Sequence, residues 1–278
     1  MKLSTLLKES VLKEDEASEQ EIKDLLKSDY KSFVSKLGSF VKDSKFVDAI
    51  KSLADKSPIK AKDMAVPVLN LRPTQNEVVL DKSLLYGLKD PKTADIFLKG
   101  GVVAVAGKSI VTAGGGKYVI DGHHRWSQLF CFNPNTKIKA LDLSDIRDPM
   151  KALKATQLGI AAQIGKVPTE PGGGVNLFGI NEDTLKKYVI ANIKDPVVEV
   201  FKKYEKGTTP EEIADYLWKN VELLKQKAKP VSGAPDREVM PQTGQAPQFT
   251  DTAVNIEKMP ESVQRLKKMI SYNKRGRW

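Results

Sequence analysis

The two histidines of the chain stand next to each other, between a glycine and an arginine. The run that holds them reads Asp121, Gly122, His123, His124 and Arg125. An arginine can donate two parallel hydrogen bonds to phosphate oxygens, and an imidazole can donate, accept or carry a proton near neutral pH. This combination predicts a site that binds an anion, phosphate above all, and that can move a proton.

The flanking residues predict a strand, a tight turn and a helix. Residues 118–120 are β-formers that follow a glycine triplet at 114–116, and Trp126, Leu129 and Phe130 recur on one face of a helix. The polar run then lies in the first helical turn. Backbone N–H groups lack intrahelical partners there and the helix dipole is positive, so phosphate binds readily.

A simpler alternative gives the run no function. Asp121 would then only cap the helix, and both imidazoles would be solvated. One isolated histidine would favour this alternative. The presence of both histidines beside an aspartate, a glycine and an arginine favours a binding site instead.

The run from Ile120 to Trp126 resembles the signature of the ParB/sulfiredoxin superfamily, in the branch with Asp-Gly-His-His-Arg that is often labelled ParB-like nuclease. The stretch 68–75, which ends in Arg-Pro-Thr-Gln, resembles the leading strand of that family and its Pro-x-Gln element. The resemblance covers residues 60–146, roughly a third of the chain. It implies a compact mixed α/β module that binds nucleotide phosphates at the start of the helix.

Two departures from the family pattern narrow the implied chemistry. Sulfiredoxins carry a catalytic cysteine where this chain has His123, so repair of sulfinic acid is not supported. CTP-hydrolysing ParB clamps carry Gly-Glu-Arg-Arg, whereas here His123 replaces the acid and His124 the first arginine. The resemblance therefore implies a nuclease or a nucleotide-dependent phosphotransferase or phosphohydrolase, and these departures weaken the case for a CTP gate.

Residue roles follow from this resemblance and from the physics of phosphoryl transfer, which depends on positioning and charge stabilisation. The expected phosphate- or nucleotide-binding residues are Arg72, Gln75, Asp121, Gly122, His123, His124 and Arg125. The expected catalytic residues are Glu77, His123, His124 and Arg125, with one histidine as general acid or base. Asp121 is the candidate ligand for Mg²⁺, or else a helix cap. The expected cofactors are Mg²⁺ and a nucleoside triphosphate or diphosphate. Zinc is not expected, because two histidines and one cysteine leave too few ligands.

Composition limits the class of protein. The chain has 278 residues, of which 40% are hydrophobic and 29% charged, as in globular proteins of one or two domains. The single cysteine, Cys131, cannot form an intrachain disulfide. No apolar run is long enough for a membrane span, and the N-terminus lacks a secretory signal. We expect a cytoplasmic protein without a membrane partner, in the host cytoplasm or the virion if a phage encodes it.

The order of elements predicts an α+β fold in which a ParB/sulfiredoxin-like module is flanked by helical regions. Five segments are expected: helical residues 1–57, the module at 60–146, a helical domain at 147–227, a flexible linker at 228–257 and a basic tail at 258–278. The linker prediction depends on its content of Pro, Gly, Gln, Ser and Thr.

Local signals predict individual elements. Residues 84–98 are expected to be helical, with a break at Pro91. Residues 102–106 and 109–112 are expected to form a hairpin with a Gly107-Lys108 turn. Thr209 before Pro210 is a strong start for another helix.

The net charge of +10 permits binding to a polyanion. The tail has seven basic residues against one acid, 7 − 1 = +6. Its candidate nucleic-acid-binding residues are Arg265, Lys267, Lys268, Lys274, Arg275 and Arg277. The alternatives to an enzyme are therefore a non-catalytic DNA-binding protein that uses this tail, or a phage-like structural protein that assembles through its N-terminal helices. The tail itself is either a nucleic-acid-binding segment or a docked helix with a solvated basic end.

Overall fold

The computed structural model describes residues 20–256. The first 19 residues of the predicted helical N-terminus and the basic tail, with its six candidate nucleic-acid-binding residues, lie outside the described residues. Within the described part the fold is mixed α/β, which confirms the predicted mixture of helices and strands.

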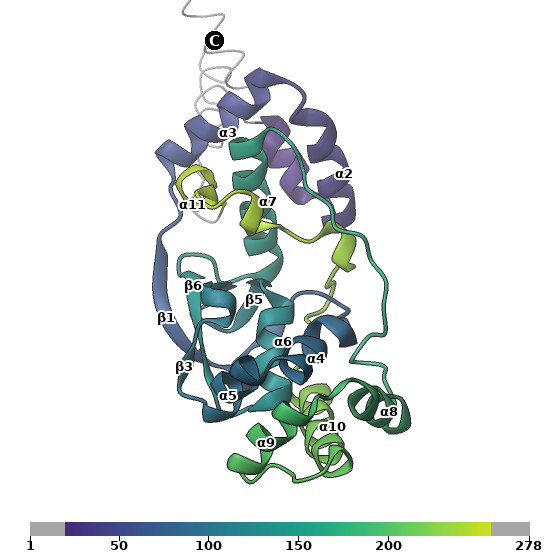
Figure 1. Ribbon diagram of the computed structural model, residues 1–278. Helices are drawn as coiled ribbons and strands as arrows, with labels where there is room; N and C mark the ends of the chain where they lie inside the picture. The colour runs from purple at the N-terminus through teal and green to yellow at the C-terminus, as the bar shows by residue number, and fades with distance from the viewer. Residues whose placement is uncertain (1–19, 257–278) are drawn as a thin grey trace, which may run out of the picture.

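A six-stranded mixed sheet lies at the centre (Figure 1). Its strands are β1 (Ala61–Pro67), β2 (Arg72–Pro73), β3 (Val102–Val103), β4 (Ile110–Ala113), β5 (Tyr118–Asp121) and β6 (Lys137–Leu143). The order is β1-β6-β4-β5-β2, and β3 also pairs with β6. Strands β1 and β6 are antiparallel, as are β4 and β5, whereas β4 is parallel to β6 and β2 to β5.

Helices cover both faces of this sheet. They include α2 (Tyr30–Phe40), α3 (Ser44–Lys56), α4 (Leu80–Lys89), α5 (Pro91–Lys99), α6 (His123–Phe132), α7 (Pro149–Ile164), α8 (Glu182–Asn192), α9 (Asp195–Lys203), α10 (Pro210–Lys227) and α11 (Phe249–Thr252). Figure 1 shows α2, α3, α7 and α11 gathered at one end and α5, α9 and α10 at the other. Residues 20–27 are also helical.

Alternation along the strands divides the interior into two cores. Val119 and Ile110 pack in the core with α4–α6 and α8–α10, whereas their neighbours Ile120 and Val111 pack in the core with α2, α3, α7 and α11. Successive side chains of a strand point to opposite faces, so a purely apolar strand buries residues on both sides. The sheet thus separates two hydrophobic cores, each covered by a layer of helices.

Two predicted helix boundaries are confirmed. Asp90 caps α5 by accepting a hydrogen bond from the Thr93 amide, and Pro91 follows at the first helical position, so the predicted stretch splits into α4 and α5. Thr209 caps α10 by accepting a hydrogen bond from the Glu212 amide. Both starts depend on local hydrogen bonds, which a short sequence specifies.

The predicted hairpin over residues 102–112 is wrong. Strands β3 and β4 both pair in parallel with β6, β3 at residues 137–138 and β4 at residues 140–143, so they follow one another along the same strand. Between them Ala106 and Gly107 have positive φ angles of 52° and 71°. These residues make a local bend, and the chain then continues in the same direction.

The predicted linker is also wrong over the residues that the structure describes, because residues 228–256 pack against the rest of the chain. The Val231 amide donates to the Pro73 carbonyl, and Met240, Phe249 and Val254 are buried. Widely spaced apolar residues anchor this segment, although its composition is typical of a linker. We call residues 228–256 the strap.

The N-terminal helices use their apolar faces inside the molecule. Phe33 and Leu37 of α2 and Phe46 and Ile50 of α3 are buried in the core that contains α7. The predicted assembly role therefore cannot use these faces in the folded chain. Within residues 20–256, no helix combines the length and the apolar character that crossing a membrane requires.

Substitution of two helical glycines tests how the strap docks. A Cβ at Gly159 of α7 would lie 2.5 Å from the Phe249 carbonyl oxygen and 2.6 Å from the Ala253 Cβ, whereas a Cβ at Gly38 of α2 would meet nothing within 4 Å. We expect Gly159→Ala to lower the free energy of unfolding by about 1–3 kcal/mol through overpacking. Gly38→Ala should raise it by about 0.5–1 kcal/mol. Urea unfolding measures both, and equal effects would show that the strap does not contact α7.

Candidate functional site

The turn between β5 and α6 positions the site. The strand ends at Asp121, Gly122 has φ 93° and ψ 27°, and α6 begins at His123, as the sequence predicts. A Cβ at Gly122 would lie 2.6 Å from Ile110 Cγ2, so both the left-handed backbone and the close packing require glycine. Gly122 itself holds the N-cap position, and the predicted cap by the Asp121 side chain is wrong.

His123 connects α6 to the chain that follows β2. Its imidazole is 4% exposed, and its Nε2 accepts a hydrogen bond of 3.1 Å from the Thr74 amide. The Thr74 hydroxyl donates to the Val119 carbonyl at 2.6 Å. His123 therefore holds the start of the helix against the end of β2 and has little surface left for a ligand.

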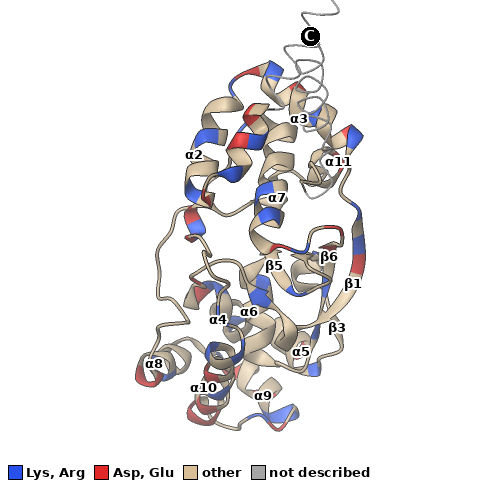
Figure 2. Ribbon diagram, turned by 180° about the vertical axis from the view of Figure 1, so that it is seen from behind, with Lys and Arg blue, Asp and Glu red and all other residues tan. Residues whose placement is uncertain are grey.

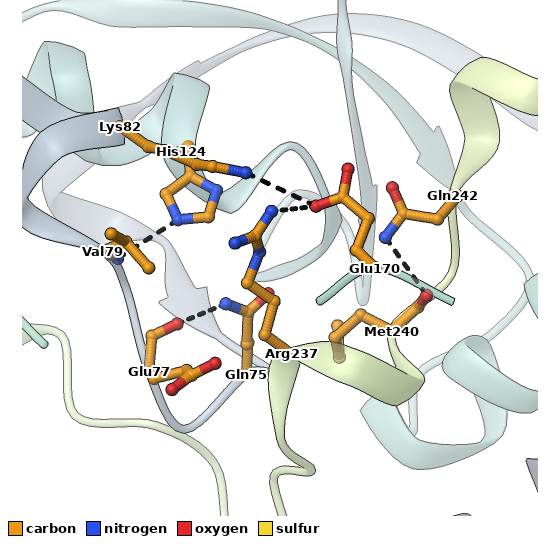
Figure 3. A network of polar contacts seen from close by, with 9 residues as sticks. All are labelled: Gln75, Glu77, Val79, Lys82, His124, Glu170, Arg237, Met240 and Gln242. Atoms are coloured by element: carbon orange, nitrogen blue, oxygen red, sulfur yellow. Dashed lines mark hydrogen bonds and ion pairs between the residues drawn. The ribbon is translucent and has the colours of Figure 1, made fainter. Parts of the chain in front are cut away.

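His124 stands beside α4 and is only partly buried. Its Nε2 accepts a hydrogen bond of 3.2 Å from the Val79 amide, just before α4 begins. A neutral imidazole that accepts at Nε2 carries its proton on Nδ1. In Figure 3 this second ring nitrogen lies on the side of the ring that faces Arg237 and Glu170.

Burial keeps both imidazoles neutral. Burial is the main cause that lowers the pKa of His123 to about 3, and electrostatic repulsion of a second proton by the adjacent His124 and by Arg125 acts in the same direction. Burial, followed by the positive charges of Arg237 and Lys82, lowers the pKa of His124 to about 3. The expectation of histidines that become cationic near neutral pH, with a pKa suited to general acid–base catalysis, is therefore wrong.

A cavity of about 180 Å³ lies at the start of α6. Six of the predicted site residues line it: Gln75, Asp121, Gly122, His123, His124 and Arg125. Six further lining residues were not predicted from the sequence: Lys82, Glu170, Arg237, Met240, Pro241 and Gln242. The cavity thus combines the predicted motif with α4, the loop after α7 and the strap.

An ion-pair network crosses this cavity (Figure 3). The Glu170 carboxylate accepts a hydrogen bond from the Arg237 guanidinium, and the same oxygen lies 3.6 Å from Lys82 Nζ. The Arg237 side chain is only 6% exposed, whereas those of Glu170 and Lys82 are 38% and 47% exposed. Glu170 lies just before the glycine triplet at 172–174, and Arg237 lies in the predicted linker, so neither carried a sequence signal of a place in a site.

Arg125 and Asp121 connect the motif to the strap on the other side. Arg125 Nη1 donates to the Ser109 carbonyl at 2.6 Å, and its Nη2 lies 3.5 Å from an Asp121 carboxylate oxygen. That oxygen also accepts a hydrogen bond from the Thr243 hydroxyl. Asp121 therefore orients Arg125 and holds the strap. Within the described residues, no group of three or more His, Cys, Asp or Glu is placed to hold a metal ion.

Two predicted site residues do not line the cavity. The Arg72 guanidinium donates to the carbonyls of Lys229 and Pro230, at 3.4 and 3.5 Å, so it holds the strap. The backbone carbonyl of Glu77 accepts a hydrogen bond from the side-chain amide, Nε2, of Gln75. The position of Glu77 just after Arg-Pro-Thr-Gln in the sequence therefore did not place it among the residues that line the cavity.

The neutral histidines predict a pH-dependent stability. Their folded-state pKa of about 3 lies below the ordinary value of 6.5, so the unfolded chain binds more protons between these limits. The contribution of each histidine to the free energy of unfolding has its full value above pH 6.5. It falls by about 1.4 kcal/mol per pH unit as the pH drops from 6.5 toward about 3.

Replacement of one histidine should reduce this dependence. From about pH 7.5 to about pH 5, His124→Gln should lose roughly 2 kcal/mol less stability than the wild type, because one titrating group is gone. Urea unfolding at several pH values measures the difference. Lys187→Ala, which changes an exposed residue of α8, should keep the wild-type slope. A wild-type slope in His124→Gln would mean that His124 is not held neutral by the fold.

Comparison with family models, curated proteins and solved structures gives no match to this chain. The superfamily resemblance of the motif therefore stays a prediction, and the case for a function depends on the geometry of the cavity.

Proposed function

We propose that this cavity binds a phosphate group of a nucleotide or nucleic acid, and that the chain is a ParB/sulfiredoxin-like enzyme of phosphoryl transfer or phosphodiester hydrolysis. The observation that carries the proposal is the position of the Glu170 carboxylate. It lies between Lys82 and Arg237 at the start of α6, where it receives the contacts that a phosphate oxygen would receive. Lys82, Arg237 and Arg125 bring three positive charges to the cavity, against two negative charges from Glu170 and Asp121.

The helix dipole supports an anion at this point. The first turns of α8 and α10 carry their own acids, Glu182 and Asp183 in α8 and Glu211 and Glu212 in α10, which Figure 2 shows in red. The first turn of α6 carries no acid. Its partial positive charge is therefore available to a bound anion, and a phosphate there also meets the N–H groups of the first turn.

The hydrogen bond of His124 supports a role for this side chain in phosphate binding. Because Nε2 accepts from Val79, the neutral ring presents an Nδ1–H donor, which can bind a phosphate oxygen and stabilise charge that develops on it. In a hydrolysis, water attacks phosphorus, the bond to the leaving oxygen breaks, and the proton of the water passes to the leaving group. Arg125 and Arg237 neutralise charge during this step.

Mg²⁺ and a nucleoside triphosphate or diphosphate are the proposed cofactors. Asp121 is the carboxylate of the cavity that would hold Mg²⁺, and phosphate oxygens and water would complete the coordination of the ion. Such an ion would add positive charge beside the phosphate. One oxygen of this carboxylate accepts hydrogen bonds from Arg125 and Thr243, which fix its position at the cavity wall.

Phosphate binding tests the cavity directly. Removal of the Lys82 ammonium should weaken binding of inorganic phosphate or ADP by about tenfold or more, because a hydrogen bond to a charged group contributes about 1.5–3 kcal/mol. Isothermal titration calorimetry compares Lys82→Ala with Lys187→Ala, which removes the same charge from an exposed site on α8. Equal affinities in both variants would exclude Lys82 from the phosphate site.

Turnover tests the enzymatic part of the proposal. ATP, ADP, CTP, GTP and a labelled oligonucleotide would be offered with Mg²⁺ to the wild type, to His124→Gln and to Arg125→Ala. We expect turnover of at least one substrate and a loss of about 10²-fold or more in the variants, the size of effect seen when a charge-stabilising donor is removed. Thermal unfolding checks that the variants fold. Unchanged turnover in both folded variants would contradict the assigned roles.

A second candidate is a protein that binds DNA without chemistry, which the net charge of +10 favours. It predicts that affinity falls steeply with salt, because neutralised phosphates release counterions. Deletion of residues 258–278 should then abolish DNA binding and leave phosphate binding unchanged.

A further inference from the structure

The cavity at the start of α6 is too small for a whole nucleotide. Its volume is about 180 Å³, whereas pockets for complete small ligands begin at about 300 Å³. A phosphate group fits, and the remainder of the substrate must lie outside. The residues that line the neighbouring cavities therefore indicate which chemical groups are attached to the phosphate.

One neighbouring cavity, of about 470 Å³, lies between α4 and α6 and shares Lys82 and His124 with the phosphate cavity. Tyr86 lines it and is 60% exposed. Lys89 lines it as well and is exposed, and Asp81 is its one acid. An exposed ring beside cations is the arrangement on which unpaired bases stack.

A second neighbouring cavity, of about 520 Å³, shares Asp121, Arg125 and Gln242 with the phosphate cavity. Its walls are the loop before β4, which includes the exposed Lys108, and the strap around Thr243. This cavity is polar at the shared wall, is otherwise lined in part by apolar residues such as Val111 and Phe249, and has Lys108 among its lining residues, so it suits a sugar and the next phosphate.

The two outer cavities lie on different sides of the start of α6. The first is on the side of His124 and α4, and the second is on the side of Arg125, Ser109 and the strap. They have different lining residues, and each shares a wall with the phosphate cavity between them. A terminal phosphate has a nucleoside on one side only, whereas an internal phosphodiester has one on both sides.

Building on the proposed function, we propose that the substrate is a single nucleic-acid strand whose internal phosphodiester occupies the phosphate cavity. One flanking base stacks on Tyr86, and the strand continues on the other side past Lys108. The strand is unpaired because a base in a duplex cannot turn its face to the Tyr86 ring. Exposed Lys82 and Lys89 on one side and Lys108 on the other neutralise the phosphates along this path.

Binding of two probes to the full chain tests this inference. The probes are thymidine 5′-monophosphate, which can occupy one side only, and a tetrathymidylate strand, which can occupy both. We expect the tetranucleotide to bind more tightly. Tyr86→Ala and Lys108→Ala should each weaken its binding, Tyr86→Ala by about tenfold, because each base that stacks on an aromatic ring adds to the affinity by about that factor or more. The monophosphate should respond to at most one of the two substitutions.

Two controls separate stacking from general effects. Tyr86→Phe keeps the ring and should retain the wild-type affinity for the tetranucleotide. Ile96→Ala removes an apolar side chain that is 51% exposed on α5 and lines none of the three cavities, so it should change neither probe. Competition by inorganic phosphate should displace both probes.

The outcomes distinguish this inference from the proposed function. If phosphate and monophosphate bind and both depend on Lys82, but the tetranucleotide binds no more tightly, the site holds a terminal phosphate and the inference is wrong. Tetranucleotide binding that is insensitive to Tyr86→Ala or to Lys108→Ala overturns it as well. If inorganic phosphate, the monophosphate and the tetranucleotide all fail to bind, the proposed function fails together with the inference.

Discussion

The site depends on the left-handed turn at Gly122, which is packed against Ile110 and admits no side chain. This turn aims the start of α6 and gives the two adjacent histidines different surroundings. His123 points into the protein and binds the Thr74 amide, so it stabilises the junction of β2 and α6. His124 and Arg125 are left to face the cavity. Two identical side chains thus have different roles because the turn sets the rotation of the helix.

Electrostatics in the cavity follow from burial and from three cations. The neutral imidazoles leave the positive charge to Lys82, Arg125 and Arg237, and the low solvent exposure of Arg237 strengthens its interactions. Glu170 offsets part of this charge. A phosphate would compete with Glu170 for the same two cations, so binding would exchange one anion for another and leave no buried charge without a partner.

The strap completes the site from a part of the chain that composition alone assigns to a linker. It is held by the Arg72 guanidinium at one end and by burial of Phe249 and Val254 at the other. Between these anchors it brings Arg237 and Gln242 to the cavity, and Thr243 to Asp121. A few well-spaced contacts are enough to order a segment rich in Pro and Gly, since proline already limits the freedom of the unfolded chain.

The sequence by itself determined the parts of this protein that depend on neighbouring residues. The β5–Gly122–α6 unit, the break before Pro91 and the start of α10 at Thr209 were predicted because strand propensity, a glycine and a helix cap act over a few residues. The five motif residues that line the cavity were found for the same reason, and Gln75 was expected from the resemblance of the Arg-Pro-Thr-Gln stretch. Only the tertiary structure decided that Arg237 and Glu170 join them and that both histidines are neutral. Those features depend on which distant segments pack together and on how much water they exclude. No local sequence pattern predicts the packing or the burial.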